Sequence, residues 1–387
     1  MPLSITDITE IRCNMINITE FYNILNNNGI KFFTGVPDSY LNGFCNFLLN
    51  NCEERNVIAA NEGNAVAIAS GHYMATGEIP LVYMQNSGLG NAVNPLVSLA
   101  DRLVYSIPMV LLIGWRGRPD SGDWAQHTRQ GAITCPLLEC MDIPYIILDK
   151  ETDHDSVLTD LIKKAGKERR AVAIVSPKGV LDGDKGNNID SDHPLSRGEA
   201  IETVLNNMPK DTVFLATTGR ATRELFYLRK KRNEDTDHDF LNVGSMGHVS
   251  SVALGMALAK PDRKFVVFDG DAAAIMHLGA MTMVSKIHVP NLIHIVLNNG
   301  AHESVGGQPS AGNKIDFIKI AEACGYKTIG RPVSTEEELS EACRTIRNCE
   351  QAGFIEVRIH KGLSAKLPPL ELSHLDAVNG LMAELKK

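Results

Sequence analysis

The chain has 387 residues, of which 44% are hydrophobic and 22% are charged, and its formal net charge at pH 7 is −8. This length is enough for two or three domains, and the composition is ordinary for a globular protein. No apolar run reaches the ~18–20 residues that a membrane helix needs, and the negative charge argues against a general affinity for nucleic acids.

Short β-branched runs alternate with amphipathic stretches from one end of the chain to the other. Strands are predicted at residues 31–36, 56–60, 80–85, 108–115, 145–148, 171–176, 212–217, 240–244, 264–270, 292–299, 326–330 and 354–360. Helical patterns lie between most of them, as over residues 64–77 and 337–349. Helices that alternate with apolar strands are typical of parallel sheets covered on both faces, so we expect an α/β fold.

The alternating pattern breaks in one place, over residues 181–196. This stretch is rich in glycine, aspartate and asparagine and has no apolar period, which is typical of a linker. We therefore expect two domains, residues 1–180 and residues 197–387, joined by this linker. Each domain is predicted to be a doubly wound parallel sheet.

The N-terminus and the cysteines bear on where the protein works. The N-terminus has no basic start followed by an apolar core, so we expect no secretion signal. The eight cysteines show no paired spacing of the kind that marks a disulfide framework or a zinc site. We therefore expect buried free thiols in a reducing compartment, and a cytoplasmic protein.

Oxygen-donating side chains follow two predicted strands of the second domain. Asp271 comes directly after the strand at 264–270, and Asn299 ends the strand at 292–299. Because ligands bind beyond the carboxyl ends of the strands in an open parallel sheet, both side chains should lie at one edge. A carboxylate, an amide oxygen and a nearby main-chain carbonyl suit Mg²⁺, which takes its other ligands from water and phosphates. Asp-Gly and Asn-Asn-Gly are also common in turns, so the spacing alone leaves both interpretations open.

This segment resembles the thiamine diphosphate motif, in which Gly-Asp is followed after a crossover by Asn-Asn. The resemblance implies that Asp271, Asn299 and the carbonyl of Ala301 hold Mg²⁺ against the diphosphate of the cofactor. Gly270 would let the diphosphate approach the backbone, and the helix that begins near Ala272 would point its N-terminus at this anion. The family usually has glycine where this chain has Ala272.

Two further segments are similar to those of the thiamine diphosphate-dependent decarboxylases. Residues 60–77 resemble the segment whose glutamate, here Glu62, contacts the aminopyrimidine ring. Residues 242–258 resemble the segment in which a large apolar side chain, here Met246, is wedged between the two cofactor rings. In the same segment the carbonyl of Gly244 would accept a hydrogen bond from the exocyclic amine.

The resemblance assigns a domain role and a set of residues to each end of the cofactor. The first domain would bind the pyrimidine and the second the diphosphate, and no middle domain separates them. The cofactor-binding set would be Glu62, Gly219, Glu224, Gly244, Ser245, Met246, Gly270, Asp271, Ala272, Asn299 and Ala301. Glu224 and Asp269 would make outer hydrogen bonds near the diphosphate, or else be surface charges.

The chain resembles still more closely the branch of the family that decarboxylates phosphonopyruvate. The similar stretches include TGVPDSYL at 34–41, QNSGLGN at 85–91 and LNNGAHESVGGQP at 297–309. The resemblance implies that 3-phosphonopyruvate is converted to phosphonoacetaldehyde and CO2, with thiamine diphosphate as the electron sink. Such a reaction belongs to phosphonate biosynthesis.

The expected reaction needs a general acid. His127 lies in QHTRQG, which resembles the active-site HT of the decarboxylases, and His302 follows the Asn-Asn pair, so both are candidates. Asp38 and Ser39 follow the strand at 31–36 and should face the same cleft. Keto-acid decarboxylases often carry a catalytic aspartate in this loop, and either Asp38 or Ser39 fits that place.

The phosphonate group of the expected substrate is a dianion, which arginines or main-chain amides bind. Arg116, Arg118 and Arg129 lie in or beside a glycine-rich loop that we interpret as a mobile lid, and His302 completes the expected substrate-binding set. The GGQP stretch at residues 306–309 would add amide donors. The alternative is that these arginines are solvated surface residues.

The two ends of the cofactor would bind different domains, which in this family usually come from different chains. The resemblance therefore implies at least a homodimer with active sites at the interface. The alternatives are a sulfopyruvate decarboxylase, a carboligating enzyme of the same family, and a regulatory relative without turnover, against which Glu62 argues. A Rossmann dehydrogenase is disfavoured, because no GxGxxG follows a predicted strand.

Overall fold

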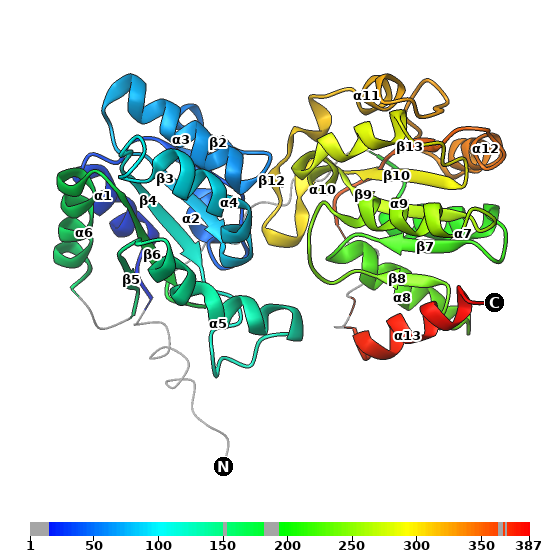
Figure 1. The fold of residues 1–387 in the computed structure, drawn as a ribbon, viewed down its shortest axis with the longest axis horizontal. Coiled ribbons are helices and arrows are strands. Elements are labelled where there is room, and N and C mark those ends of the chain that lie inside the picture. The colour runs from blue at the N-terminus through cyan, green and yellow to red at the C-terminus, as the bar shows by residue number, and fades with distance from the viewer. Residues whose placement is uncertain (1–14, 150–152, 182–192, 363–366, 368–369) are drawn as a thin grey trace, which may run out of the picture. The chain divides into compact units, whose positions relative to one another are not determined.

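The computed structural model describes residues 15–149, 153–181, 193–362, 367 and 370–387 (Figure 1). The chain divides into two compact units, Met1–Asn187 and Asn188–Lys387. Most of the predicted linker lies outside the described residues. Within the described part, no helix has the length and apolar character needed to cross a membrane.

A six-stranded sheet, in which every neighbouring pair is parallel, forms the centre of the first unit. Its strands are, in spatial order, β2 (Asn56–Ile58), β1 (Phe33–Gly35), β3 (Leu81–Gln85), β4 (Met109–Gly114), β6 (Ala171–Ser176) and β5 (Tyr145–Ile147). All residues of β1, β3, β4 and β6 are buried, except the last residue of β3, because both faces of the sheet are covered.

Alternate residues of β4 pack into two different cores. Val110 and Leu112 contact the layer formed by α1 (Ile18–Asn27), α2 (Asn42–Asn51) and α6 (His154–Glu168). Leu111 and Ile113 face the opposite layer, formed by α3 (Glu62–Thr76), α4 (Leu89–Pro95), η5 (Leu96–Ala100) and α5 (Ala125–Cys140). Two short turns, η3 (Glu53–Arg55) and η4 (Asn86–Gly88), complete the unit.

The second unit contains a five-stranded sheet with parallel pairing throughout. Its strands are, in spatial order, β13 (Gly353–Arg358), β10 (Leu292–Asn298), β9 (Phe265–Gly270), β7 (Val213–Ala216) and β8 (Asp239–Leu241). A short antiparallel hairpin of β11 (Ala301–His302) and β12 (Gln308–Pro309) follows β10.

Helices cover both faces of this second sheet as well. Val266 and Phe268 pack against α7 (Arg197–Asn207), α8 (Arg220–Lys231) and α12 (Glu336–Ile346). Phe265 and Val267 pack into the opposite core, to which α9 (Val249–Ala259), α10 (Asp271–Met276), η6 (Leu278–Ser285), α11 (Phe317–Ala323) and α13 (His374–Glu384) contribute. Two further turns are η7 (Glu303–Val305) and η8 (Ala311–Asn313). The predicted doubly wound α/β fold is thus confirmed in both units.

Two predictions about local structure need correction. The segment at 326–330 is not a strand: Lys327 makes only an isolated bridge to Gly353, and Gly330, with φ of 78°, then turns the chain away. The described cysteines are free, but they are not all buried. Cys45, Cys52 and Cys343 are buried, whereas Cys140, the last residue of α5, is exposed.

Candidate active site

Glu62 is a buried acid at the start of a helix in the first unit. It is the first residue of α3, and the Asn61 side chain fixes that start by accepting a hydrogen bond from the Asn64 N–H at 2.9 Å. The Glu62 carboxylate accepts a hydrogen bond from Nδ2 of Asn91 on α4 at 2.8 Å. Burial raises the pKa of Glu62, and the bond from Asn91 lowers it in part.

Because Gly88 has no side chain, the Glu62 carboxylate can occupy the space beside its Cα atom. A Cβ atom at position 88 would overlap Oε1, Cδ and Cγ of Glu62. The backbone of Gly88 has φ of −74° and ψ of −16°, which any L-residue adopts, so the conformation itself does not require glycine. The absence of a side chain at Gly88 therefore serves to position Glu62.

Asp38 is a second fully buried acid, in the loop that follows β1. Its carboxylate accepts hydrogen bonds from Nε2 of Gln85, at the end of β3, at 2.6 Å and from the Tyr40 N–H at 3.0 Å. A Cβ atom on Gly114, at the end of β4, would overlap Asp38 Oδ2. Burial raises the pKa of Asp38. Ser39 Oγ is buried, with no hydrogen-bond partner among the described residues.

Arg116 follows β4 and is paired within its own loop. Its guanidinium donates to both carboxylate oxygens of Asp123, at 3.1 and 2.9 Å, and lies 5.1 Å from the centroid of the Tyr40 ring. The Tyr40 hydroxyl donates to the same carboxylate at 3.1 Å. The predicted lid is therefore held at its centre by a bidentate ion pair, and the charge of Arg116 is balanced by Asp123.

The other two predicted substrate-binding arginines, Arg118 and Arg129, do not take part in the ion pair between Arg116 and Asp123. Arg118 is exposed and lies 5.6 Å from the Trp115 ring centroid, and Arg129 is exposed on α5. His127, also on α5, is half-buried, and burial and the nearby charge of Arg116 lower its pKa. A Cβ atom on Gly117 would overlap the His127 carbonyl, so the loop packs closely against this helix.

Asp271 is a buried acid of the second unit and comes directly after β9. Ser310 donates a hydrogen bond to its Oδ2, and the backbone N–H groups of Ala272 and Asn299 also bond the carboxylate. Burial raises the pKa of Asp271 to about 6, although these bonds lower it. A Cβ atom on Gly312 would overlap Asp271 Oδ2, which places η8 against the acid.

Asn299 follows β10 and lies beside Asp271. Its Oδ1 accepts a hydrogen bond from the Ala301 N–H at 3.1 Å, and its Nδ2 donates to Glu303 Oε2 at 2.9 Å. Both Asn299 and Ala301 are buried. The described residues contain no cluster of three or more His, Cys, Asp or Glu side chains suited to a metal, so the candidate donors are one carboxylate, one amide oxygen and a backbone carbonyl.

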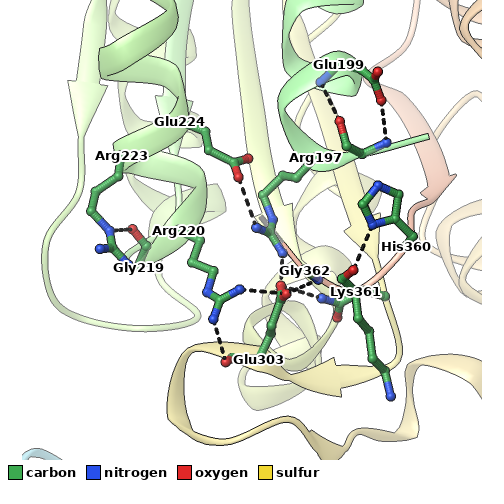
Figure 2. A network of polar contacts seen from close by, with 12 residues as sticks. Arg197, Glu199, Gly219, Arg220, Arg223, Glu224, Glu303, His360, Lys361 and Gly362 are labelled. Atoms are coloured by element: carbon green, nitrogen blue, oxygen red, sulfur yellow. Dashed lines mark hydrogen bonds and ion pairs between the residues drawn. The ribbon is translucent and has the colours of Figure 1, made fainter. Parts of the chain in front are cut away.

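Gly219 and Glu224 lie around a charged network in the second unit (Figure 2). Gly219, with φ of 104°, is the N-cap of α8, and its carbonyl accepts a hydrogen bond from Arg223 at 3.4 Å. Glu224 Oε1 lies 3.5 Å from Nη1 of Arg197. Burial raises the pKa of Glu224, and the charge of Arg197 lowers it. Glu224 is 4% exposed, so it is not a surface charge.

The loop of Gly244, Ser245 and Met246 follows β8. Its Gly244 N–H donates to Asn242 Oδ1 at 3.2 Å, and Ser245 has φ of 48°. Met246 is half-buried. A Cβ atom on the next residue, Gly247, would lie 2.9 Å from the Ala273 carbonyl, so this loop lies against α10 and hence near Asp271.

His302 and Asp269 are buried near the same sheet edge. Burial lowers the pKa of His302 to about 4, so the imidazole is neutral at pH 7. Asp269 is not a surface charge: it lies 3.3 Å from Nε2 of the buried His294 and accepts a hydrogen bond from the Gly270 N–H at 3.0 Å.

Sequence reasoning missed several residues that contact the predicted donors. Ser310 and Gly312 contact Asp271, and Glu303 contacts Asn299. The hairpin of β11 and β12 brings the first two residues back to the sheet edge. In the sequence, the glycines at 306 and 307 after the Asn-Asn pair were the feature that could have predicted this hairpin. Nothing in the sequence marked Glu303 as the partner of Asn299.

Two family models match the chain. "Thiamine pyrophosphate enzyme, N-terminal TPP binding domain" matches residues 19–134, which include Glu62. "Thiamine pyrophosphate enzyme, C-terminal TPP binding domain" matches residues 217–357, which include Asp271 and Asn299.

Two individual proteins are similar to the chain over most of its length, and a third over about half of it. The phosphonopyruvate decarboxylase of Streptomyces viridochromogenes is 33% identical over 362 residues, covering 86% of each chain. The sulfopyruvate decarboxylase of Methanosarcina acetivorans is 29% identical over 378 residues, covering 92% of this chain and 94% of the relative. The sulfopyruvate decarboxylase subunit beta of Methanocaldococcus jannaschii is 28% identical over 186 residues, covering 46% of this chain and 93% of the subunit.

Proposed function

The chain belongs to the thiamine pyrophosphate enzymes, and on this premise we propose that it decarboxylates 3-phosphonopyruvate to phosphonoacetaldehyde and CO2, using thiamine diphosphate and Mg²⁺. The observation that carries the proposal is the similarity, along most of both chains, to a phosphonopyruvate decarboxylase. Sulfopyruvate is the second candidate substrate, because a sulfopyruvate decarboxylase matches as much of the chain at lower identity.

The chemistry of the buried donors fits this cofactor. Asp271, Asn299 and the Ala301 carbonyl offer hard oxygen ligands, which suit Mg²⁺ that also binds diphosphate oxygens. Glu62 is a buried acid whose raised pKa suits a hydrogen bond to a ring nitrogen of the aminopyrimidine. Thiamine diphosphate, when bound, supplies the sink for the electron pair that CO2 leaves behind.

We assign the remaining cofactor-binding residues by the same reasoning. Gly219, Glu224, Gly270 and Ala272 would surround the diphosphate. The Gly244 carbonyl would accept from the exocyclic amine, Ser245 would hold this loop in place, and Met246 would support the rings.

The proton that replaces CO2 would come from the first unit. Asp38 is fully buried and its pKa is raised, so it retains a proton to a higher pH than an exposed aspartate. His127 and Ser39 are the neighbouring candidates for relaying this proton. We assign the phosphonate to Arg116, Arg118, Arg129 and His302, with the neutral His302 acting as a hydrogen-bond partner rather than as a cation.

We further propose that the enzyme acts in the cytoplasm as at least a homodimer, with active sites at the interface. The subunit beta of the Methanocaldococcus jannaschii enzyme corresponds to about half of this chain. Half of the chain therefore has a counterpart that is named as a subunit, which supports a catalytic unit assembled from separate domains. Sedimentation of the purified protein tests the expected dimer.

The substrate assignment predicts the outcome of a direct comparison. With Mg²⁺ and thiamine diphosphate present, kcat/KM for CO2 release from phosphonopyruvate is expected to exceed that from pyruvate by about 10⁴-fold, because a site built for a polar group rejects the analogue that lacks it. Sulfopyruvate should fall between them, since its sulfonate carries one charge fewer. Faster turnover of pyruvate would show the substrate to be wrong, and faster turnover of sulfopyruvate would select the second candidate.

The space at Gly88 predicts a second result. Gly88→Ala should lower kcat by about 10²-fold, because the added methyl displaces the Glu62 carboxylate. A catalytic group that is misplaced by about 1 Å typically lowers the rate by about this factor. Gly90→Ala is the matched control, since a Cβ atom at position 90 meets nothing within 4 Å. Equal kcat values for the two variants would mean that Gly88 does not position Glu62.

A further inference from the structure

The Asn299 amide, a proposed magnesium ligand, is held by a side chain that the family comparison does not assign. Glu303 lies in η7, one turn beyond Asn299, and its Oε2 accepts a hydrogen bond from Asn299 Nδ2 at 2.9 Å. The carboxylate is 6% exposed. Figure 2 shows it at the centre of a network that links α7, α8 and the segment after β13.

Four donors fix the Glu303 carboxylate in place. Oε1 accepts from Arg220 Nη1 at 2.7 Å and from the Gly362 N–H, while Oε2 accepts from Arg197 and Asn299. Arg220 also donates to the Glu303 carbonyl at 3.3 Å, which anchors the backbone of the same residue. A carboxylate with all these bonds has one orientation only.

This arrangement determines which end of the Asn299 amide faces which way. A carboxylate bonded to two guanidinium groups accepts hydrogen bonds and donates none, so the NH2 of Asn299 must face Glu303. Oδ1 must then face the opposite side, where it accepts from the Ala301 N–H at 3.1 Å. A carbonyl oxygen has two lone pairs, so one remains for a further partner.

The charge of Glu303 is neutralised by the cations around it. Arg197 lies between Glu303 and Glu224, and Arg220 pairs with Glu303. The charge of Arg223 also acts on Glu224 and Arg220, so two acids face three arginines. The acid at position 303 therefore does not serve as a net negative charge for a cation. Its effect on a metal would act through the direction of the Asn299 oxygen.

We propose that Glu303 is a positioning residue that aims Oδ1 of Asn299 at the magnesium ion. The inference rests on the proposed magnesium site and adds a residue to it. Groups that orient metal ligands in this way change metal affinity by about 10–100-fold when they are removed.

The test measures binding by calorimetry with the full-length protein. Glu303→Gln is expected to raise the Kd for Mg²⁺ by about 10–100-fold at saturating thiamine diphosphate, because the glutamine amide can hold Asn299 in either orientation. The Kd for thiamine diphosphate at saturating Mg²⁺ should change much less. If Glu303 acted by charge alone, its removal beside two arginines would instead tighten binding of the diphosphate.

A second substitution tests orientation directly. A carboxylate at position 299 presents an oxygen whichever way it turns, so the double variant Glu303→Gln/Asn299→Asp should recover most of the Mg²⁺ affinity. Glu199→Ala is the control for lost stability: it removes the capping box of α7, next to Arg197, and leaves the bond between Glu303 and Asn299 in place. Its Kd for Mg²⁺ should match that of the unaltered protein.

The outcomes separate this inference from the proposed function. If Glu303→Gln leaves the Kd for Mg²⁺ unchanged, or if the double variant binds no better than the single one, Glu303 does not orient Asn299. If the unaltered protein binds thiamine diphosphate equally well without any divalent cation, the proposed magnesium site itself is wrong and the role of Glu303 falls with it.

Discussion

Glu62→Gln is expected to lower kcat by about 10²–10⁴-fold, the range that a positioned acid or base contributes to a reaction. Glutamine has the shape of glutamate and keeps an oxygen that can accept the bond from Asn91 Nδ2. It cannot exchange a proton with a ring nitrogen. The variant therefore removes the proposed chemical function while it preserves the packing against Gly88 and α4.

The same substitution is expected to leave the fold as stable as before, or more so. Burial raises the folded-state pKa of Glu62 above its ordinary value of 4.5. Such a carboxyl contributes stability below pH 4.5, and this contribution is lost as the pH rises through the folded-state pKa. At neutral pH glutamine avoids the loss, so any gain in thermal midpoint over the unaltered protein should grow across that pH window.

Steady-state decarboxylation and thermal unfolding between pH 4.5 and 8 check both parts. A Glu62→Gln variant that turns over substrate at a near-normal rate would refute the assignment of Glu62. A large fall in thermal midpoint at neutral pH would show that the carboxylate is structural.

Asp271→Ala is expected to weaken the binding of Mg²⁺ and of thiamine diphosphate by more than about 100-fold. Removing a residue that only orients a metal ligand lowers metal affinity by up to about 100-fold. Asp271 is itself a proposed ligand, and it is the only carboxylate among the three, so its removal should have a larger effect. The loss of cofactor affinity should follow the loss of metal, because the diphosphate is expected to bind through Mg²⁺. Calorimetric titration of the apoprotein with each component measures the two effects.

Ser310→Ala is the graded control for this experiment. It removes the hydroxyl that donates to Asp271 Oδ2 and leaves the carboxylate itself. A smaller loss of Mg²⁺ affinity than in Asp271→Ala is therefore expected. Unchanged affinity in Asp271→Ala would place the metal, if there is one, elsewhere.

The backbone around the candidate site could be predicted from the sequence, because it depends on local patterns. The apolar strands that Asp271 and Asn299 directly follow are central strands of a parallel sheet, and β9 and β10 pair side by side. Their carboxyl ends meet at one edge for geometric reasons that hold in any such sheet. The strand predicted at 326–330 failed because a β-branched run beside Gly330 does not by itself determine pairing.

The side-chain partners could not be predicted, because they join residues far apart in the chain. Arg197 and Glu303 are separated by 106 residues, and Gly362 and Glu303 by 59. Arg116 illustrates the same limit over a short distance. The sequence shows three arginines and two aspartates in and beside one loop. Only the fold decides that the two carboxylate oxygens of Asp123 accept from Nε and Nη2 of Arg116.

If Glu62 and Asp271 bind the cofactor and its metal as proposed, the stability of the folded chain depends on the supply of thiamine and Mg²⁺. Without a bound partner, Glu62 and Asp271 are carboxyls removed from water, which favours the unfolded chain at neutral pH. A ligand that binds only the folded chain stabilises it by RT ln(1 + [L]/Kd). A cell short of thiamine would then expose more of this protein to proteases, and its abundance would fall together with its catalytic rate.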